Sequence, residues 1–279
     1  MRHARFPGPS LGSFAASLIF AAGPACAQSG ASSPVPELEE VVVTATLRPV
    51  ALARLPASAT VLDQRTIRDS ANQHLEELLP QVPSLSWAGA SSRPRYFQLR
   101  GVGELEQYQG APNPSVGFLV DEIDFSGIGM VATLIDVEQV EVLQGPQGTR
   151  NGANALAGLI KVKTREPVPE STLSTFVGLA EDGQWDMGVV AGGALATGDG
   201  AAWRVALQRQ HSDGFRRNAF LGRDDTNDRE ETTARARLRL FPVEGWQADV
   251  TATWTDLDNG YDAFAIDNSY RTLSDRPGR

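Results

Sequence analysis

The chain has 279 residues, 21% of them charged, and a formal net charge of -9. Proteins bind nucleic acid through clustered Lys and Arg, so this acidic balance argues against a nucleic-acid partner. The length allows one or two domains. Because no apolar run of about 18 residues follows Gly23, the sequence predicts no helix across a membrane.

Residues 1–27 have the pattern of a secretory signal peptide that is cleaved on export. A basic start over residues 2–5 precedes an uncharged apolar stretch over 11–22, and small residues at 25–27 suit cleavage. The alternatives are a core helix, which several prolines and glycines disfavour, and a lipid-modified cysteine. Cleavage removes the only cysteine, so the mature chain is expected to hold no disulfide and no thiolate metal site.

Residues 28–49 are predicted to be a flexible linker that carries a short strand-forming segment. The small, polar and proline-containing residues 28–36 suit a mobile tail. The run that follows has strong strand propensity. It consists of Glu40, Val41, Val42, Val43, Thr44 and Ala45. Such a strand can add to the sheet edge of another protein, or it can be the first strand of the following domain, and the pattern favours neither.

Residues 50–167 have the mixed pattern of a small α+β domain. Two short helices are predicted, over Asp63–Ser70 with Asp63 as the cap and over Asn72–Leu79 with Asn72 as the cap. Apolar runs separated by glycine and proline predict strands at Tyr96–Leu99, Val116–Val120, Val137–Leu143 and Leu159–Val162.

After Pro167 the hydrophobic pattern changes to a period of two. Five segments have one apolar and one polar face, at 171–180, 185–195, 201–209, 231–241 and 246–255. Strands of about ten residues with this alternation are typical of a transmembrane β-barrel, whereas strands of soluble sandwiches are usually shorter. Short turns at 197–200 and 242–245 alternate with a long polar loop over 212–230, as barrels require. A long tail is expected from Asp256 onward.

Taken together, these segments resemble the TonB-dependent receptor family. The run DVEQVEVLQGPQGTRNGANALAGLIKVKT over 136–164 matches the plug signature of that family almost position by position. LEELLPQVP at 75–83, FQLRG at 97–101 and VGFLVD at 116–121 support the match, and EVVVTA at 40–45 resembles the TonB box. The plug motif positions of interest are Arg100, Gly101, Glu141, Gly145, Pro146, Gly148, Gly152 and Gly158.

The resemblance implies an α+β plug domain followed by the first strands of an antiparallel transmembrane β-barrel, in the outer membrane of a Gram-negative bacterium. It implies energy-coupled uptake of a nutrient, often a ferric siderophore. The implied partners are TonB, outer-membrane lipid and a metal chelate or other nutrient ligand. Family barrels have roughly 22 strands, so residues 168–279 would form an incomplete barrel, and a fragment or truncated frame is expected. The alternative is a soluble periplasmic plug-like binding module without transport activity.

No enzymatic or cofactor chemistry is predicted. The three histidines, His3, His74 and His211, are far apart in the sequence, and no metal-ligand set or nucleophile triad is visible. The glycine-rich run over 144–152 lacks the Gly-Lys-Ser/Thr ending of a phosphate-binding loop. The chain is therefore predicted to be a non-enzyme without a cofactor or metal site.

The remaining candidate residues concern contacts of the plug. Arg100 and Glu141 are predicted to be structural contacts, because charges in a buried domain need partners. By the resemblance, the loops over 103–115 and 121–130 face outward and meet the ligand. Tyr108, Asp124 and Phe125 are the candidate ligand contacts there, and an ordinary loop role is an equally good interpretation of all three.

Overall fold

The computed structural model describes residues 41–45, 49–70, 72–89, 92–105, 113–148, 153–195, 200–216, 218, 221–241 and 245–261. Glu40–Arg279 form one compact unit. The predicted signal peptide, residues 28–36 of the linker, Glu40, Tyr108 and Gly152 lie outside the described residues. In the part of the chain that is described, no helix is long and apolar enough to cross a membrane.

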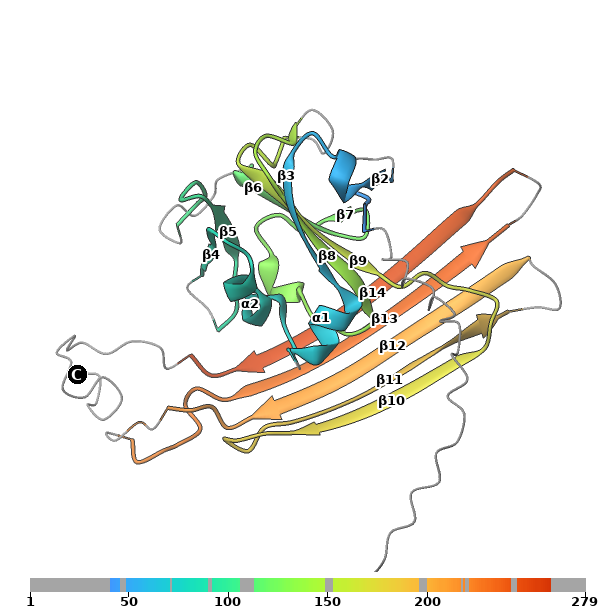
Figure 1. The fold of residues 1–279 in the computed structure, drawn as a ribbon. Helices are drawn as coiled ribbons and strands as arrows, with labels where there is room; N and C mark the ends of the chain where they lie inside the picture. The colour runs from blue at the N-terminus through green and yellow to red at the C-terminus, as the bar shows by residue number, and fades with distance from the viewer. Residues whose placement is uncertain are drawn as a thin grey trace, which may run out of the picture. The chain divides into compact units, whose positions relative to one another are not determined.

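A mixed five-stranded sheet in the order β3-β8-β9-β6-β7 is the centre of the α+β domain (Figure 1). Only the β6 and β9 pair is parallel, and the other neighbours are antiparallel. The strands are β3 (Ser58–Asp63), β6 (Val116–Val120), β7 (Ile123–Asp124), β8 (Val137–Gln144) and β9 (Gly158–Thr164). The smaller elements are β1 (Val42–Val43), β2 (Val50–Ala51), the hairpin of β4 (Leu85–Ala88) with β5 (Tyr96–Leu99), and the 3-10 turns η1 (Leu52–Arg54) and η3 (Gly129–Val131).

Helix α1 (Gln64–Asp69) begins where the sequence predicts, since the Asp63 carboxylate accepts a hydrogen bond from Thr66 N at 2.8 Å. The predicted start of the second helix at Asn72 is wrong. Helix α2 (Leu75–Leu78) is capped by His74, whose Nδ1 accepts from Glu76 N at 3.2 Å.

The second helix starts late because the residues before it are held in an extended conformation. Gln73 O accepts from Leu134 N at 3.0 Å, and Leu75 N donates to Ala132 O at 2.9 Å. His74 lies between these bonds and is fully buried. The helix then continues into the 3-10 turn η2 (Leu79–Gln81), which includes Pro80.

The hydrophobic core lies between one face of the sheet and the two helices. It contains Leu78, Phe118, Val140 and Ile160, all completely buried. Full burial of one such side chain contributes about 1.5–3 kcal/mol. The helices therefore pack on the sheet through apolar side chains.

The second sheet, named here the wall sheet, is purely antiparallel in the order β10-β11-β12-β13-β14. Its strands are β10 (Thr172–Leu179), β11 (Trp185–Ala194), β12 (Ala201–Ser212), β13 (Arg229–Leu240) and β14 (Ala248–Asn259). Figure 1 shows the strands side by side with chain-order neighbours adjacent. The last strand corrects a prediction, because Asp256 to Asn259 continue the strand and are not part of a tail. Their pairing with Arg229 to Thr232 of β13 extends it.

The two faces of the wall sheet are opposite in polarity to those of a soluble sheet. Its polar face is buried, with Arg204, Glu231 and Arg235 each at most 5% exposed. Its apolar face is open, with Val250 55% and Trp254 56% exposed. A strand with a polar inner and an apolar outer face is the barrel pattern. The predicted fold class, an α+β domain followed by the first antiparallel strands of a barrel-type sheet, is confirmed.

Candidate functional site

The segment predicted as a partner-binding strand lies against the α+β domain. Its residues Val42 and Val43 form β1, which pairs antiparallel with β2. Val43 and Ala45 are buried in a small apolar cluster with Leu143 and Leu159. The alternative of a first strand of the following domain therefore describes the conformation seen here. Binding of a partner by this segment stays a prediction.

The carboxylate of Glu141 holds the end of this segment. Thr44 N donates to Oε1 at 2.8 Å and to Oε2 at 3.0 Å, and Thr44 Oγ1 donates to Oε1 at 2.7 Å. Ala45 N donates to Oε2 at 2.7 Å. Glu141 is 0% exposed, and a buried carboxylate needs such donors because burial removes its water. The predicted structural contact of Glu141 thus has a specific partner, the backbone of residues 44 and 45.

A second side chain of β8 contacts the same segment. Gln139 Nε2 donates to Val42 O at 3.1 Å and to Glu141 Oε1 at 2.5 Å. Gln139 and Glu141 lie two residues apart on one strand, so their side chains emerge on the same face of the sheet. Together they contact the backbone of the segment from residue 42 to residue 45.

The remaining motif positions shape the backbone. Arg100 differs from expectation, because its side chain is exposed and its φ is 52°, followed by Gly101 with φ 77°. Gly145 has φ 99° and precedes Pro146 in the turn after β8. Gly158 is required by close packing, since a Cβ there would lie 2.3 Å from Leu99 Cδ1. A Cβ at Gly148 would meet no atom closer than 3.9 Å.

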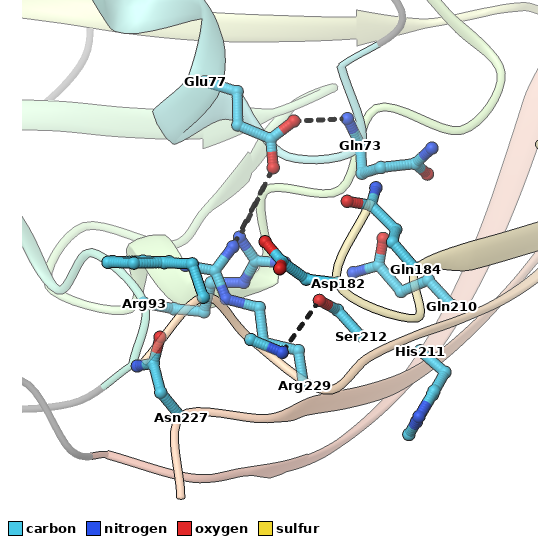
Figure 2. Close-up of a pocket in the computed structure, with 12 residues that line it drawn as sticks. Gln73, Glu77, Arg93, Asp182, Gln184, Gln210, His211, Ser212, Asn227 and Arg229 are labelled. Atoms are coloured by element: carbon cyan, nitrogen blue, oxygen red, sulfur yellow. Dashed lines mark hydrogen bonds and ion pairs between the residues drawn. The ribbon is translucent and has the colours of Figure 1, made fainter. Parts of the chain in front are cut away.

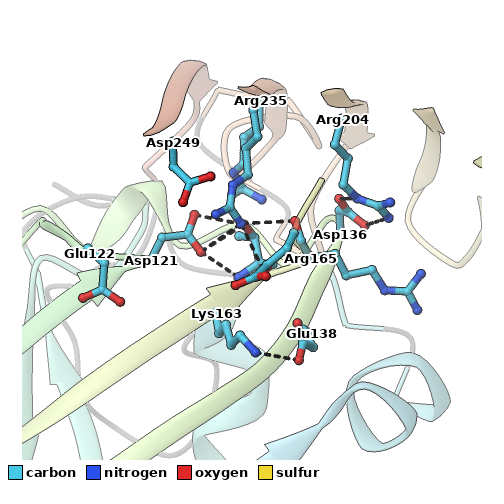
Figure 3. A network of polar contacts seen from close by, with 12 residues as sticks. Asp121, Glu122, Asp136, Glu138, Lys163, Arg165, Arg204, Arg235 and Asp249 are labelled. Atoms are coloured by element: carbon cyan, nitrogen blue, oxygen red, sulfur yellow. Dashed lines mark hydrogen bonds and ion pairs between the residues drawn. The ribbon is translucent and has the colours of Figure 1, made fainter. Parts of the chain in front are cut away.

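An ion pair and hydrogen bonds from arginines join the α+β domain to the polar face of the wall sheet (Figure 3). Arg204 of β12 donates to both carboxylate oxygens of Asp136, each at 2.6 Å. On β13, Arg235 donates to Ile135 O at 3.0 Å, and Arg237 donates to Thr164 Oγ1 at 2.8 Å. The sequence showed these arginines only as the polar face of alternating strands, and it gave no indication of their partners.

A second group of charges lies where β13 begins. Arg93 is 2% exposed and donates to Glu231 of β13 at 2.6 Å and to Glu76 at 2.5 Å. Arg229 also pairs with Glu76, at 3.0 Å. Burial raises the pKa of the neighbouring Glu77 above its ordinary value. Within this group the pair of Arg93 and Glu231 lies away from water, and each side chain depends on the other for compensation.

A small polar cavity of about 170 Å³ opens beside this group (Figure 2). It is lined by Gln73, Glu77, Arg93, Asp182, Gln184, Gln210, His211, Ser212, Gly214, Phe215, Asn227 and Arg229. Its amide, carboxylate and guanidinium groups can donate to and accept from a polar ligand.

Neither described candidate ligand residue lines this polar cavity. Asp124 accepts from Ser126 N and Asn154 Nδ2, both at 2.8 Å. Phe125 is partly buried and packs against the hydrophobic core. Ligand contact by Asp124 and Phe125 stays a prediction. Within the described ranges, no group of three or more His, Cys, Asp or Glu residues is arranged to hold a metal ion.

The chain is similar to a plug-domain family and to known receptors. Residues 51–159 match the family model described as "TonB-dependent Receptor Plug Domain". The pesticin receptor of Yersinia pestis is 28% identical over 201 residues, which are 70% of this chain and 29% of that protein. The chain thus spans under a third of this curated relative.

Two solved structures have a fold similar to that of this chain. The ferric yersiniabactin uptake receptor FyuA of Yersinia pestis aligns with a TM-score of 0.61 and 27% identity, over 71% of this chain and 31% of that one. The ferripyoverdine receptor of the outer membrane of Pseudomonas aeruginosa aligns with a TM-score of 0.64 and 18% identity, over 78% of this chain and 27% of that one. At that identity the second likeness shows the fold alone.

Proposed function

We propose that this chain, whose residues 51–159 belong to the TonB-dependent receptor plug family, is the plug and the first part of the barrel wall of an outer-membrane receptor. That receptor takes up a nutrient, most often a ferric siderophore or a similar iron complex, with energy supplied through TonB. In this proposal residues 1–27 are a cleaved signal peptide, 28–49 a linker with the TonB box, 50–167 the plug and 168–279 barrel wall.

The observation that carries the proposal is the polarity of the wall sheet. Its buried face presents Arg204, Glu231 and Arg235 to the α+β domain, and its open face presents Val250 and Trp254. In water the open face would expose a broad apolar surface, whereas in a membrane the lipid would contact and bury that surface. A soluble periplasmic binding module, the second candidate, offers no such cover and is therefore the weaker proposal.

The ligand class in this proposal is supported by the relatives. FyuA, the solved relative at 27% identity, is named as a ferric yersiniabactin uptake receptor. The relatives named above are receptors, and enzymatic activity is not part of the proposal.

The coupling partner in this proposal is TonB, and residues 40–45 are its binding segment. A β-branched segment, of whose described residues 41–45 two form a strand, can add to the sheet of a partner through backbone hydrogen bonds. Outer-membrane lipid is the second partner, in contact with the open face of the wall sheet.

Uptake by whole cells tests the proposal. The complete receptor that carries this chain should be produced in a Gram-negative host that lacks its own siderophore receptors. The probes are radio-iron-labelled catecholate, hydroxamate and phenolate siderophores and labelled cobalamin. We expect accumulation of at least one probe, lost in a host without TonB, and recovery of the protein in the outer-membrane fraction. Recovery in the soluble periplasmic fraction without any TonB-dependent accumulation would favour the binding module.

A further inference from the structure

The strand β1 has two edges, and both are occupied in this structure. Val41 O accepts from Leu52 N at 2.8 Å, and Val43 lies opposite Val50 of β2. Backbone groups of alternate residues in an extended segment point to opposite edges. The groups of Val42 and Thr44 therefore point away from β2.

The edge that faces away from β2 is covered by side chains. Gln139 Nε2 donates to Val42 O, as the N–H of a neighbouring strand would do. The Glu141 carboxylate accepts from Thr44 N, as the carbonyl of a neighbouring strand would do. These two side chains of β8 thus occupy the backbone hydrogen-bonding groups, Val42 O and Thr44 N, that an incoming strand would need.

We infer that Gln139 and Glu141 form a clasp that competes with a strand-donating partner for the outward edge of β1. The partner is an extended peptide strand, and within the proposed function, on which this inference rests, it belongs to TonB. Strand addition draws its affinity from backbone hydrogen bonds. A partner strand can gain them at Val42 and Thr44 only after the clasp has opened.

The cost of opening the clasp comes from its charge and burial. Glu141 is 0% exposed, and it accepts hydrogen bonds from two backbone N–H groups and one hydroxyl of Thr44 and Ala45. Hydrogen bonds to a charged group are stronger than those between neutral groups. The clasp therefore lowers the affinity of the segment for its partner, and it does so without any contact with that partner.

The test uses the membrane receptor purified in detergent and the periplasmic domain of TonB as the probe. Two readouts are needed: hydrogen–deuterium exchange of the Thr44 and Ala45 amides, and the Kd of the TonB domain by calorimetry. For Glu141→Ala we expect faster exchange and about tenfold tighter binding, which corresponds to a gain of about 1.4 kcal/mol. Glu141→Gln keeps the size of the side chain and one acceptor oxygen, and it should give an intermediate result.

Glu104 provides a matched control. Its carboxylate accepts from Ser115 N at 2.9 Å and from Ser115 Oγ at 2.6 Å, which is the same kind of clasp at another place in the domain. Glu104→Ala should change neither readout. Equal Kd values for the wild type, Glu141→Ala and Glu141→Gln would overturn the clasp while leaving TonB coupling in place. Absence of binding by every variant would overturn both the clasp and the proposed function.

Discussion

The buried ion pair between Arg204 and Asp136 allows a quantitative test of how the wall sheet holds the plug. Each Asp136 oxygen accepts from the guanidinium at 2.6 Å, and both side chains are 6% exposed. Asp136→Asn removes the charge and leaves Arg204 buried without its counter-charge, which costs about 3–5 kcal/mol. The backbone is not a complication, because Asp136 has φ 57° and Asn tolerates that conformation equally well.

Two companion variants separate the ion pair from other effects. The double variant Asp136→Asn with Arg204→Met buries no charge and should recover most of the loss. Glu166→Gln is the control, since Glu166 is 46% exposed in its pair with Arg239, and an exposed pair is worth about 0–1 kcal/mol. The assay is pulse proteolysis of the plug in increasing denaturant, with the receptor in detergent. Equal shifts for Asp136→Asn and Glu166→Gln would refute the reasoning.

Three further predictions follow from single positions. Val42→Pro should abolish TonB-dependent uptake while ligand binding persists, because proline blocks backbone pairing. Normal uptake by this variant would show that residues 40–45 do not couple the receptor to TonB. Gly158→Ala should destabilise the plug by about 1–3 kcal/mol in denaturant unfolding, because its Cβ would lie 2.5 Å from Leu143 O. Gly148→Ala is the control and should have little effect. Equal effects of the two substitutions would contradict the packing argument. Burial, and next the charge of Arg93, lowers the pKa of His74 below its ordinary value of 6.5. The unfolded chain therefore binds a proton first, and plug stability should fall as pH falls through about 6.5, by at most about 1.4 kcal/mol per pH unit. His74→Gln should reduce that slope, and an unchanged slope would assign it to other groups.

Features encoded by neighbouring residues were predictable from the sequence. The strands at Tyr96–Leu99 and Val116–Val120 have the predicted bounds, and Asp63 caps α1 as expected. The five wall strands were also found from their period of two, because a barrel strand needs opposite polarity on its two faces. Each of these signals is contained within about ten residues of chain.

Features that depend on distant partners were not predictable. The start of α2 is set by bonds of Gln73 and Leu75 to a segment about 60 residues later. The extension of β14 past Asp256 is imposed by its ladder with β13. Glu141 was recognised as part of a motif, but its partner Thr44 is 97 residues away in the chain, and no local pattern contains that pairing.

The position of β8 explains how the predicted coupling segment could move while the plug stays in place. β8 lies between β3 and β9 and pairs with both along its length. The residue before it, Asp136, is held by Arg204 of the wall sheet. β1, in contrast, has a ladder of two residue pairs with β2 and the contacts with Gln139 and Glu141. Removal of β8 must break two ladders and a buried ion pair, whereas release of β1 breaks one short ladder, a few side-chain hydrogen bonds and a small apolar contact. A pull on residues 40–45 is therefore expected to free β1 first, with the sheet of the plug still intact and its charges still paired with the wall.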